Sequence, residues 1–322
     1  MSRKLPGSLA VVVLTAAVAF AAPGAAQARS VPGDGPVVSA VAQLSPEVAR
    51  TVTGTGVEAR QRALAEYWTP ARMRAAKPES EIPAVQAARA AGQSGQRASQ
   101  PQGPPGTIAP AAPAAEPIIA GYPVGHPVAR TTGKVFFTVN GGNYTCMGTI
   151  VNTEGKSAVW TAGHCVIWDG LWATNWVFVP NWNGSAPYGY WYPTRLFTTP
   201  ANDVGAAVLA RNNGWRICDY LGGQGIAWNR GLPADVYVFG YYASELVAGR
   251  SPAYGNGSDY YLVVSMPPGT FLGPWLIEFD GNWGLLNGYS VARSGSCPQC
   301  VYSPYYGNQV ANLYNAIRYL SS

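Results

Sequence analysis

The sequence predicts an all-β protein from about Ile118 to the C-terminus. Short apolar runs rich in Val, Phe, Trp and Tyr recur along this part of the chain, and clusters of Gly, Asn, Pro and Ser separate them. Short strands with turn residues between them are typical of barrels and sandwiches rather than of alternating strands and helices. About 200 residues of this kind are enough for two small barrels packed together.

Each expected strand corresponds to one apolar run. The runs are 134-KVFFTV-139, 148-GTIV-151, 158-AVWTA-162, 176-WVFVP-180, 204-VGAAVLA-210, 235-DVYVFGY-241, 260-YYLVVS-265 and 274-PWLIEF-279. Only 308-NQVANLYNAIRYL-320 has apolar residues every three or four positions, which predicts a C-terminal helix with Asn308 as its N-cap.

The first residues have the features of a secretory signal peptide. Arg3 and Lys4 are basic, residues 9–22 are apolar, and residues 26–28 supply the small side chains that a signal peptidase reads. We therefore expect residues 1–28 to be a signal peptide and the mature protein to be secreted. We expect no membrane span, because no later run reaches about 18 apolar residues.

Residues 29–117 are expected to form a propeptide-like, disordered Ala-Pro-rich linker. Residues 84–117 consist largely of Ala, Gln, Pro and Gly, a composition that buries too little apolar surface to offset the entropy of ordering. Upstream, residues 57–76 predict a short helix that Pro70 interrupts. A plain linker also fits, but a position between a signal peptide and a compact domain favours a propeptide.

The charge distribution does not favour a nucleic-acid partner. The whole chain has a formal net charge of +5, but from Ile118 onward ten Lys and Arg stand against nine Asp and Glu, which leaves +1. The basic excess thus lies in the first third of the chain, and the C-terminal part has no Lys/Arg cluster among its aromatic residues.

The five cysteines are candidates for disulfides, since bridges persist outside the cell. Their odd number leaves at least one free or paired outside the chain. The stretch 297-CPQC-300 also fits a zinc site, but it lacks a second such pair and a nearby pair of histidines. We therefore expect no metal and no other cofactor.

The densest chemical signal is 159-VWTAGHCVI-167, which contains one of the two histidines in the chain. The other, His126, stands in a Gly/Pro-rich stretch and is assigned no role. The segment around His164 resembles the Thr-Ala-Ala/Gly-His-Cys motif of chymotrypsin-like serine peptidases, in which the histidine is the general base.

The resemblance extends over residues 118–322 and is to secreted bacterial enzymes of the trypsin-like and glutamyl-endopeptidase-like branches. It implies two packed six-stranded Greek-key barrels and a C-terminal helix. The first barrel is expected at about 118–212 and the second at about 213–322.

The resemblance also implies a disulfide and a second catalytic side chain. The family has a cysteine on the strand before the histidine, and Cys146 in 144-YTCMGTIV-151 fits, which implies a Cys146–Cys165 bridge. Asp203 matches the aspartate that fixes the histidine tautomer, although an aspartate before a strand is also a common turn cap. The partner of Cys218 stays open between Cys297 and Cys300.

The nucleophile motif departs from the family pattern. The family reads Gly-Asp/Asn-Ser-Gly-Gly-Pro, and the only candidate here is 269-GTFLGPW-275, with Phe271 at the serine position. A phenyl ring has no lone pair with which to attack a carbonyl. The resemblance assigns the oxyanion hole to the backbone amides of Gly269 and Phe271, where the phenylalanine side chain would crowd the substrate.

We therefore expect a secreted peptidase homologue, inactive or severely impaired, that binds a peptide or protein ligand in the former substrate cleft, and we expect it to be a monomer. One alternative is an active endopeptidase with a non-standard nucleophile, and the candidates are Thr270, Ser265, Ser294 and Ser296. Another is a glycan- or cell-wall-binding protein that uses the aromatic residues of 168–182 and 188–193. Burial of these rings in the barrel core is the competing interpretation.

Overall fold

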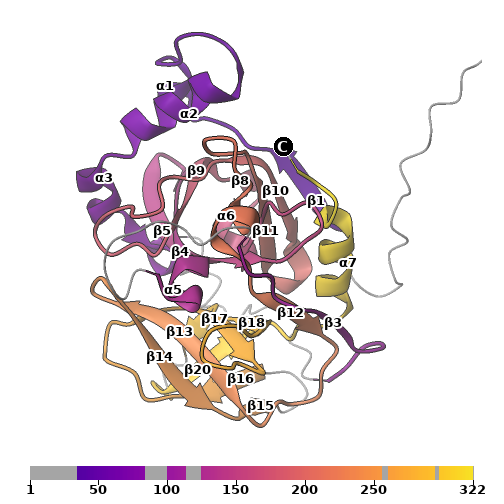
Figure 1. Ribbon diagram of the computed structural model, residues 1–322. Coiled ribbons are helices and arrows are strands. Elements are labelled where there is room, and N and C mark those ends of the chain that lie inside the picture. The colour runs from indigo at the N-terminus through magenta and orange to yellow at the C-terminus, as the bar shows by residue number, and fades with distance from the viewer. Residues whose placement is uncertain (1–34, 84–99, 114–124, 256–259, 294–296, 322) are drawn as a thin grey trace, which may run out of the picture.

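The protein is described by a computed structural model over residues 35–83, 100–113, 125–255, 260–293 and 297–321. Curled β-sheets make up most of the molecule, and a helix, α7 (Asn308–Ile317), lies near the C-terminus (Figure 1). The predicted all-β, double-barrel class with a terminal helix is confirmed. No helix in these ranges is long and apolar enough to cross a membrane.

The first barrel is built from six antiparallel strands. In sheet order they are β10 (Pro193–Thr199), β11 (Val204–Leu209), β6 (Ala158–Ala162), β5 (Gly142–Val151), β4 (Thr132–Val139) and β9 (Thr174–Pro180). The sheet closes where Phe178 and Trp191 exchange backbone hydrogen bonds of 2.8 and 2.9 Å. Closure leaves few free strand edges.

The second half of the chain forms two sheets. The larger has the order β14 (Glu245–Ser251), β13 (Val236–Tyr242), β17 (Phe271–Ile277), β18 (Leu285–Tyr289), β12 (Gly225–Trp228) and β3 (Gly106–Ile108). The smaller has the order β15 (Ala253–Gly255), β16 (Tyr260–Val263), β20 (Cys300–Ser303) and β19 (Ala292–Arg293). Val238, Tyr260, Trp275 and Val301 are buried between them.

Short elements connect the strands. They are α5 (Pro127–Thr131), η2 (Gly163–Cys165), β7 (Ile167–Trp168), β8 (Leu171–Trp172), η3 (Pro200–Asn202) and α6 (Ile217–Leu221). The helix α7 begins as predicted, but its N-cap is Gly307 and not Asn308. The side chain of Asn308 is used elsewhere: it accepts a hydrogen bond of 2.7 Å from Asn229 and donates one to the carbonyl of Gln102.

The prediction that residues 29–117 form no packed structure is wrong for 35–83. This part, the N-terminal segment, contains β1 (Val38–Val41), α1 (Pro46–Ala49), α2 (Gly56–Tyr67), α3 (Pro70–Ala75), β2 (Lys77–Pro78) and η1 (Glu79–Glu81). Figure 1 shows its helices along one side of the first barrel. The predicted interruption at Pro70 is confirmed, since α2 ends at Tyr67 and α3 begins at Pro70.

A few large side chains hold the N-terminal segment in place. Leu64, Trp68 and Met73 pack in one buried cluster with Phe136 and Val177 of the barrel. The Trp68 indole donates a 2.6 Å hydrogen bond to a backbone carbonyl of β9, and β1 pairs with β10. The composition predicted disorder wrongly because only a few large side chains hold this segment. The residues that they contact lie on strands far away along the chain. Residues 1–34 and 84–99 lie outside the described ranges.

Part of the Ala-Pro-rich stretch 84–117, which was expected to be a linker, also contributes to the fold. Residues 106–108 form β3, which pairs with β12 at the edge of the larger sheet. Gly106 is required there, because a Cβ at this position would lie 2.2 Å from the Trp228 ring.

The cysteine pairing is partly as predicted. The Cys146–Cys165 disulfide is confirmed. The expectation that Cys218 pairs with Cys297 or Cys300 is wrong, because those two are bonded to each other. Cys218 is a buried free thiol, and burial raises its pKa to about 11.

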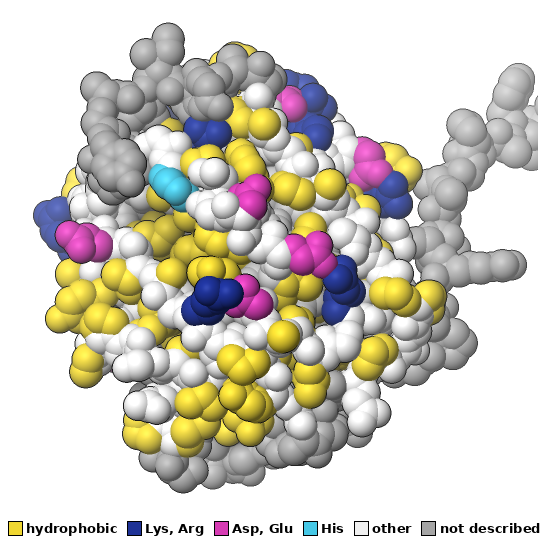
Figure 2. All heavy atoms as spheres, turned by 60° about the horizontal axis from the view of Figure 1, so that its bottom comes forward, with side chains coloured by type: hydrophobic (Ala, Val, Ile, Leu, Met, Phe, Trp, Pro, Cys, Tyr) yellow, Lys and Arg dark blue, Asp and Glu magenta, His cyan; other side chains and the backbone are white. Residues whose placement is uncertain are grey.

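The charged side chains are dispersed over the face that Figure 2 presents. Basic and acidic side chains there lie in small mixed groups separated by apolar and uncharged atoms, and no continuous basic stretch crosses this face.

Removal of the Cys146–Cys165 bridge tests its contribution to stability. We expect the C146A/C165A variant to lose about 3 kcal/mol of unfolding free energy in urea denaturation, because the bridge closes a long loop in the unfolded chain. The matched control is C297A/C300A, whose cysteines are only three residues apart as against 19. Equal losses in both variants would contradict this expectation.

Candidate active site

His164 lies in η2, the single turn that follows β6. All residues of β6 are buried, so this turn starts from a fixed position between the barrels. Gly163 is required by close packing, because a Cβ there would lie 2.9 Å from the Asp203 carbonyl carbon. The Gly163 amide also donates a 2.9 Å hydrogen bond to the Asp203 carbonyl oxygen. The backbone thus brings Asp203 next to His164.

The side chains of His164 and Asp203 form a close pair. His164 Nδ1 lies 3.0 Å from Oδ1 and 2.9 Å from Oδ2 of Asp203, and the His164 amide donates a 2.8 Å hydrogen bond to Oδ1. His164 is buried, whereas the Asp203 side chain is 34% exposed. Asp203 has a left-handed backbone with φ 52°, an uncommon conformation that is often found at functional sites.

This geometry suits an imidazole that donates from Nδ1 and carries its lone pair on Nε2. A carboxylate in this position fixes the tautomer and stabilises the imidazolium. The catalytic roles of His164 and Asp203 stay predictions.

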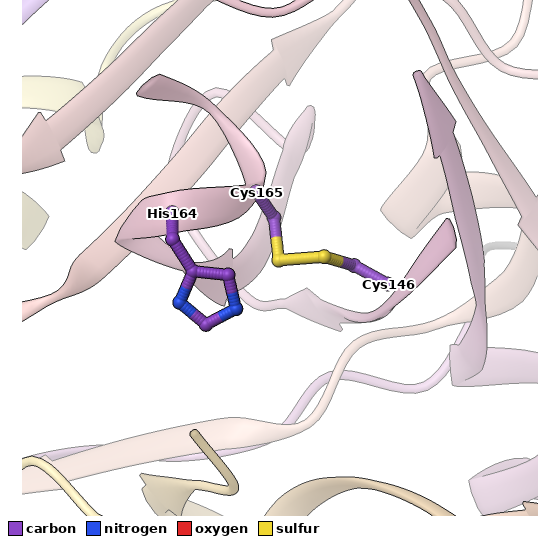
Figure 3. Close-up of side chains that lie close together, drawn as sticks. All are labelled: Cys146, His164 and Cys165. Carbon is purple, nitrogen blue, oxygen red and sulfur yellow. A yellow bond between two sulfur atoms is a disulfide. The ribbon is translucent and has the colours of Figure 1, made fainter. Parts of the chain in front are cut away.

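The disulfide lies directly beside the histidine. Figure 3 shows the His164 imidazole next to the Cys146–Cys165 bridge. These three residues have the spacing of metal ligands, but both sulfur atoms are used in the bridge and supply no thiolate. The Trp168 ring approaches His164 edge-on at 6.3 Å, and the Trp176 indole donates a hydrogen bond to the Cys165 carbonyl.

The tryptophans of residues 168–182 are packed into the protein. Trp176 and Trp182 are buried, and Trp168 and Trp172 are half-buried. This stretch offers no row of exposed rings to a glycan.

Phe271 begins β17 and pairs with Tyr241 of β13. The preceding turn is held by Thr270, whose amide and hydroxyl both donate to the Pro267 carbonyl, at 3.0 and 2.6 Å. Gly269 has φ +83°, which explains a glycine at this position. The predicted oxyanion-hole role of the Gly269 and Phe271 amides remains untested.

The loop 269–275 lies against the strand that carries the disulfide. A Cβ on Gly273 would lie 2.7 Å from the sulfur of Met147, the residue after Cys146. The position predicted for the nucleophile is therefore near the bridge, and a half-buried phenyl ring occupies it.

The structure does not favour the alternative nucleophiles that it describes. The Thr270 side chain is buried and its hydroxyl is engaged with Pro267, while Ser265 is exposed beyond the end of β16. Ser294 and Ser296 lie outside the described residues.

Two features of the site have no signal in the sequence. The first is Lys134, whose ammonium group lies 5.8 Å from the centre of the Phe271 ring and 5.7 Å from that of Tyr241. Burial lowers the pKa of Lys134, and the ammonium has no ion pair with any described residue.

The second feature is the path of the N-terminal segment. β2 pairs in parallel with β5, with Lys77 opposite Tyr144 and Pro78 opposite Thr145, next to Cys146. Farther along, Ile82 is 2% exposed and belongs to the core.

Glu79 lies between these two points and is close to the second barrel. The pKa of Tyr289 in β18 is raised well above its ordinary value, chiefly by burial, and the charge of Glu79 adds to this effect. Residues 77 and 78 therefore lie beside the strand that carries the disulfide, and Glu79 lies close enough to Tyr289 for their charges to interact.

Comparison with solved structures identifies the family. A thermostable serine protease, AL20, from an extremophilic microorganism has 26% identity and a TM-score of 0.54 over 59% of this chain and 97% of that one. The protease Anisep from Arthrobacter nicotinovorans has 31% identity and a TM-score of 0.54 over 60% of this chain and 97% of its own. A Glu endopeptidase also matches, with 15% identity and a TM-score of 0.46 over 60% and 94% of the two chains.

Neither a protein-family model nor a curated protein sequence matches. The solved relatives are matched over almost their full length, and the double-barrel fold agrees with them. The chain belongs to the chymotrypsin-like serine protease family.

Replacement of Lys134 tests the cost of its burial. We expect Lys134→Met to raise the unfolding free energy at pH 7 by about 1 kcal/mol, because an unpaired ammonium is removed from a partly desolvated position. The pKa is lower in the folded than in the unfolded chain, so the penalty disappears as pH rises from the lowered value towards 10.5. Urea denaturation at pH 7 and at pH 10 should therefore show a smaller gain at pH 10. A gain that is constant or grows with pH would contradict this.

Proposed function

We propose that this chain is an exported peptidase homologue that has lost serine-nucleophile chemistry and acts by binding an extended peptide between its barrels. The observation that carries the proposal is Phe271. It stands at the position of the nucleophile in a chain that otherwise holds His164 and Asp203 in hydrogen-bonded contact. Without a nucleophilic atom at that position, no acyl-enzyme forms there.

The open edge of β5 supports the binding role. β6 pairs only with Thr149–Val151 of β5, which leaves the edge at Tyr144 and Thr145 available. Here β2 fills that edge as an added strand. Backbone hydrogen bonds of this kind give affinity for extended peptides, and neighbouring pockets select their side chains.

Export is part of the proposal. Its support is the signal-like start of the sequence and the two disulfides, which are typical of proteins outside the reducing cytosol. We also propose that residues 29–117 are a propeptide and that its segment 35–83 occupies the peptide site before removal.

An activity-based probe tests the loss of chemistry. We expect a fluorophosphonate not to label the purified protein, because the probe needs an activated hydroxyl. Labelling that is abolished by His164→Ala would overturn the proposal.

A restored loop provides the positive control. The variant T270N/F271S/L272G recreates the family motif between Gly269 and Gly273. We expect it to be labelled once the N-terminal segment has been cleaved off, because His164 and Asp203 are already paired. If the probe labels the restored variant but not the natural protein, then Phe271 and its neighbours are what blocks the reaction.

Competition tests the peptide site. A site-specific protease sequence placed within residues 84–99 allows the N-terminal segment to be severed, and Trp68→Ala weakens its hold. We expect a fluorescent peptide of residues 75–83 to bind the cleaved W68A protein at least about tenfold more tightly than the uncleaved one, because the tether keeps the native segment at millimolar effective concentration.

A scrambled peptide of the same composition is the control for this experiment. Binding of the two peptides with equal affinity, or no gain after cleavage, would contradict a strand-specific site on β5.

A further inference from the structure

An aromatic cavity lies on the first barrel, away from the His164 site. It has a volume of about 310 Å³, and its main lining residues are Tyr188, Trp191, Asn212, Asn213, Trp215 and Tyr220. β11 runs from Val204, next to Asp203, to Leu209, shortly before Asn212. A strand of this length spans about 20 Å, so the two sites are separate.

The rings of the cavity form a row from the interior to the surface. The Trp191 and Tyr220 centroids are 6.2 Å apart, and those of Tyr220 and Trp215 are 6.0 Å apart. Trp191 is 1% exposed, Tyr220 is half-buried and Trp215 is 42% exposed. The inner ring is thus fixed in the core, and the outer ring is accessible to a ligand.

A tight hairpin holds the outer ring. Asn212 and Trp215 exchange two backbone hydrogen bonds of 3.0 Å, and the two residues between them, Asn213 and Gly214, have φ of 49° and 80°. Two positive φ values are typical of a type I′ turn, in which strand direction and twist are well defined. The Trp215 side chain is therefore presented from a rigid backbone.

The polar groups of the cavity are uncharged. Asn212 donates one amide hydrogen to the Tyr190 carbonyl, which leaves its carbonyl oxygen as an acceptor. The Asn213 side chain and the Trp215 indole have no hydrogen-bond partner among the described residues. Arg216 and Asp219 nearby are paired with each other at 2.6 Å.

These properties select among ligands. A phosphate or carboxylate ligand needs a cationic lining, but none of the lining residues carries a charge. A purely apolar ligand would leave the asparagine amides without partners. A pyranose ring has an apolar face of C–H groups for the aromatic wall and hydroxyl groups for the amides.

We propose that this cavity binds one neutral sugar ring of a glycan chain, with Trp215 stacked on the ring and Asn212 and Asn213 bonded to its hydroxyl groups. The size lies at the lower end of the range for small-molecule pockets, which fits a single ring rather than an oligosaccharide. The proposal does not rest on the peptidase-homologue function, since the cavity lies at the other end of β11.

Calorimetric titration of the full chain with chitotetraose, cellotetraose and solubilised peptidoglycan fragments tests the proposal. We expect at least one of these probes to bind, and Trp215→Ala to weaken its affinity at least tenfold while Trp215→Phe retains part of it. The matched control is Tyr254→Ala, which removes a similarly exposed ring, 41% accessible, from the second barrel and should leave binding unchanged.

Thermal unfolding of each variant shows whether the fold is kept, and a folded W215A protein with wild-type affinity would overturn the proposal. So would failure of all three saccharides to bind. Aromatic grooves also accept proline-rich peptides. Binding of a proline-rich peptide in place of the saccharides would assign the cavity to a protein partner and would equally overturn the sugar site.

Discussion

The arrangement of the molecule depends on the two edges of β5. One edge is paired with β4 from Gly142 to Thr149, but β6 covers only the last three residues of the other. The remaining open edge lies beside Cys146, the residue that ties β5 to the histidine turn. An unpaired strand edge is open to pairing with other chains, and proteins often cover such edges. In this structure the cover is β2, and the position of the whole N-terminal segment follows from that contact together with the Trp68 anchor.

The same strand connects the barrels. β17 approaches β5 through Gly273 and Met147, and the loop before it places Phe271 near Lys134 of β4. The histidine turn is fixed from the other side by Asp203 at the start of β11. The candidate site is therefore assembled from three strands whose relative positions are set by barrel packing. Phe271 is half-buried within this packing.

The sequence predicted the parts of this arrangement that depend on local patterns. Most strands of the first barrel and the terminal helix follow from the pattern of apolar residues, and the His164–Asp203 pair follows from the resemblance to chymotrypsin-like peptidases. The N-terminal helices were missed because Trp68 finds its partner on β9, 107 residues away, and composition contains no information on such contacts. Lys134 was missed for a related reason: alternation places it on a strand, but only the packing of the second barrel turns two aromatic rings towards it.

Three consecutive residues, Thr270, Phe271 and Leu272, are best understood as one packed unit. Thr270, Phe271 and Leu272 all lie against Gly240 of β13, where a Cβ would come within 2.9 Å of atoms from each of them. The Thr270 and Leu272 side chains thus fill a surface that Gly240 leaves open, and Thr270 adds two hydrogen bonds to the turn. A serine alone at position 271 would leave the neighbouring Thr270 and Leu272 packed as they are, in a backbone path that the family keeps free for glycine. The packing of this loop is therefore consistent with its own sequence, from Thr270 through Leu272.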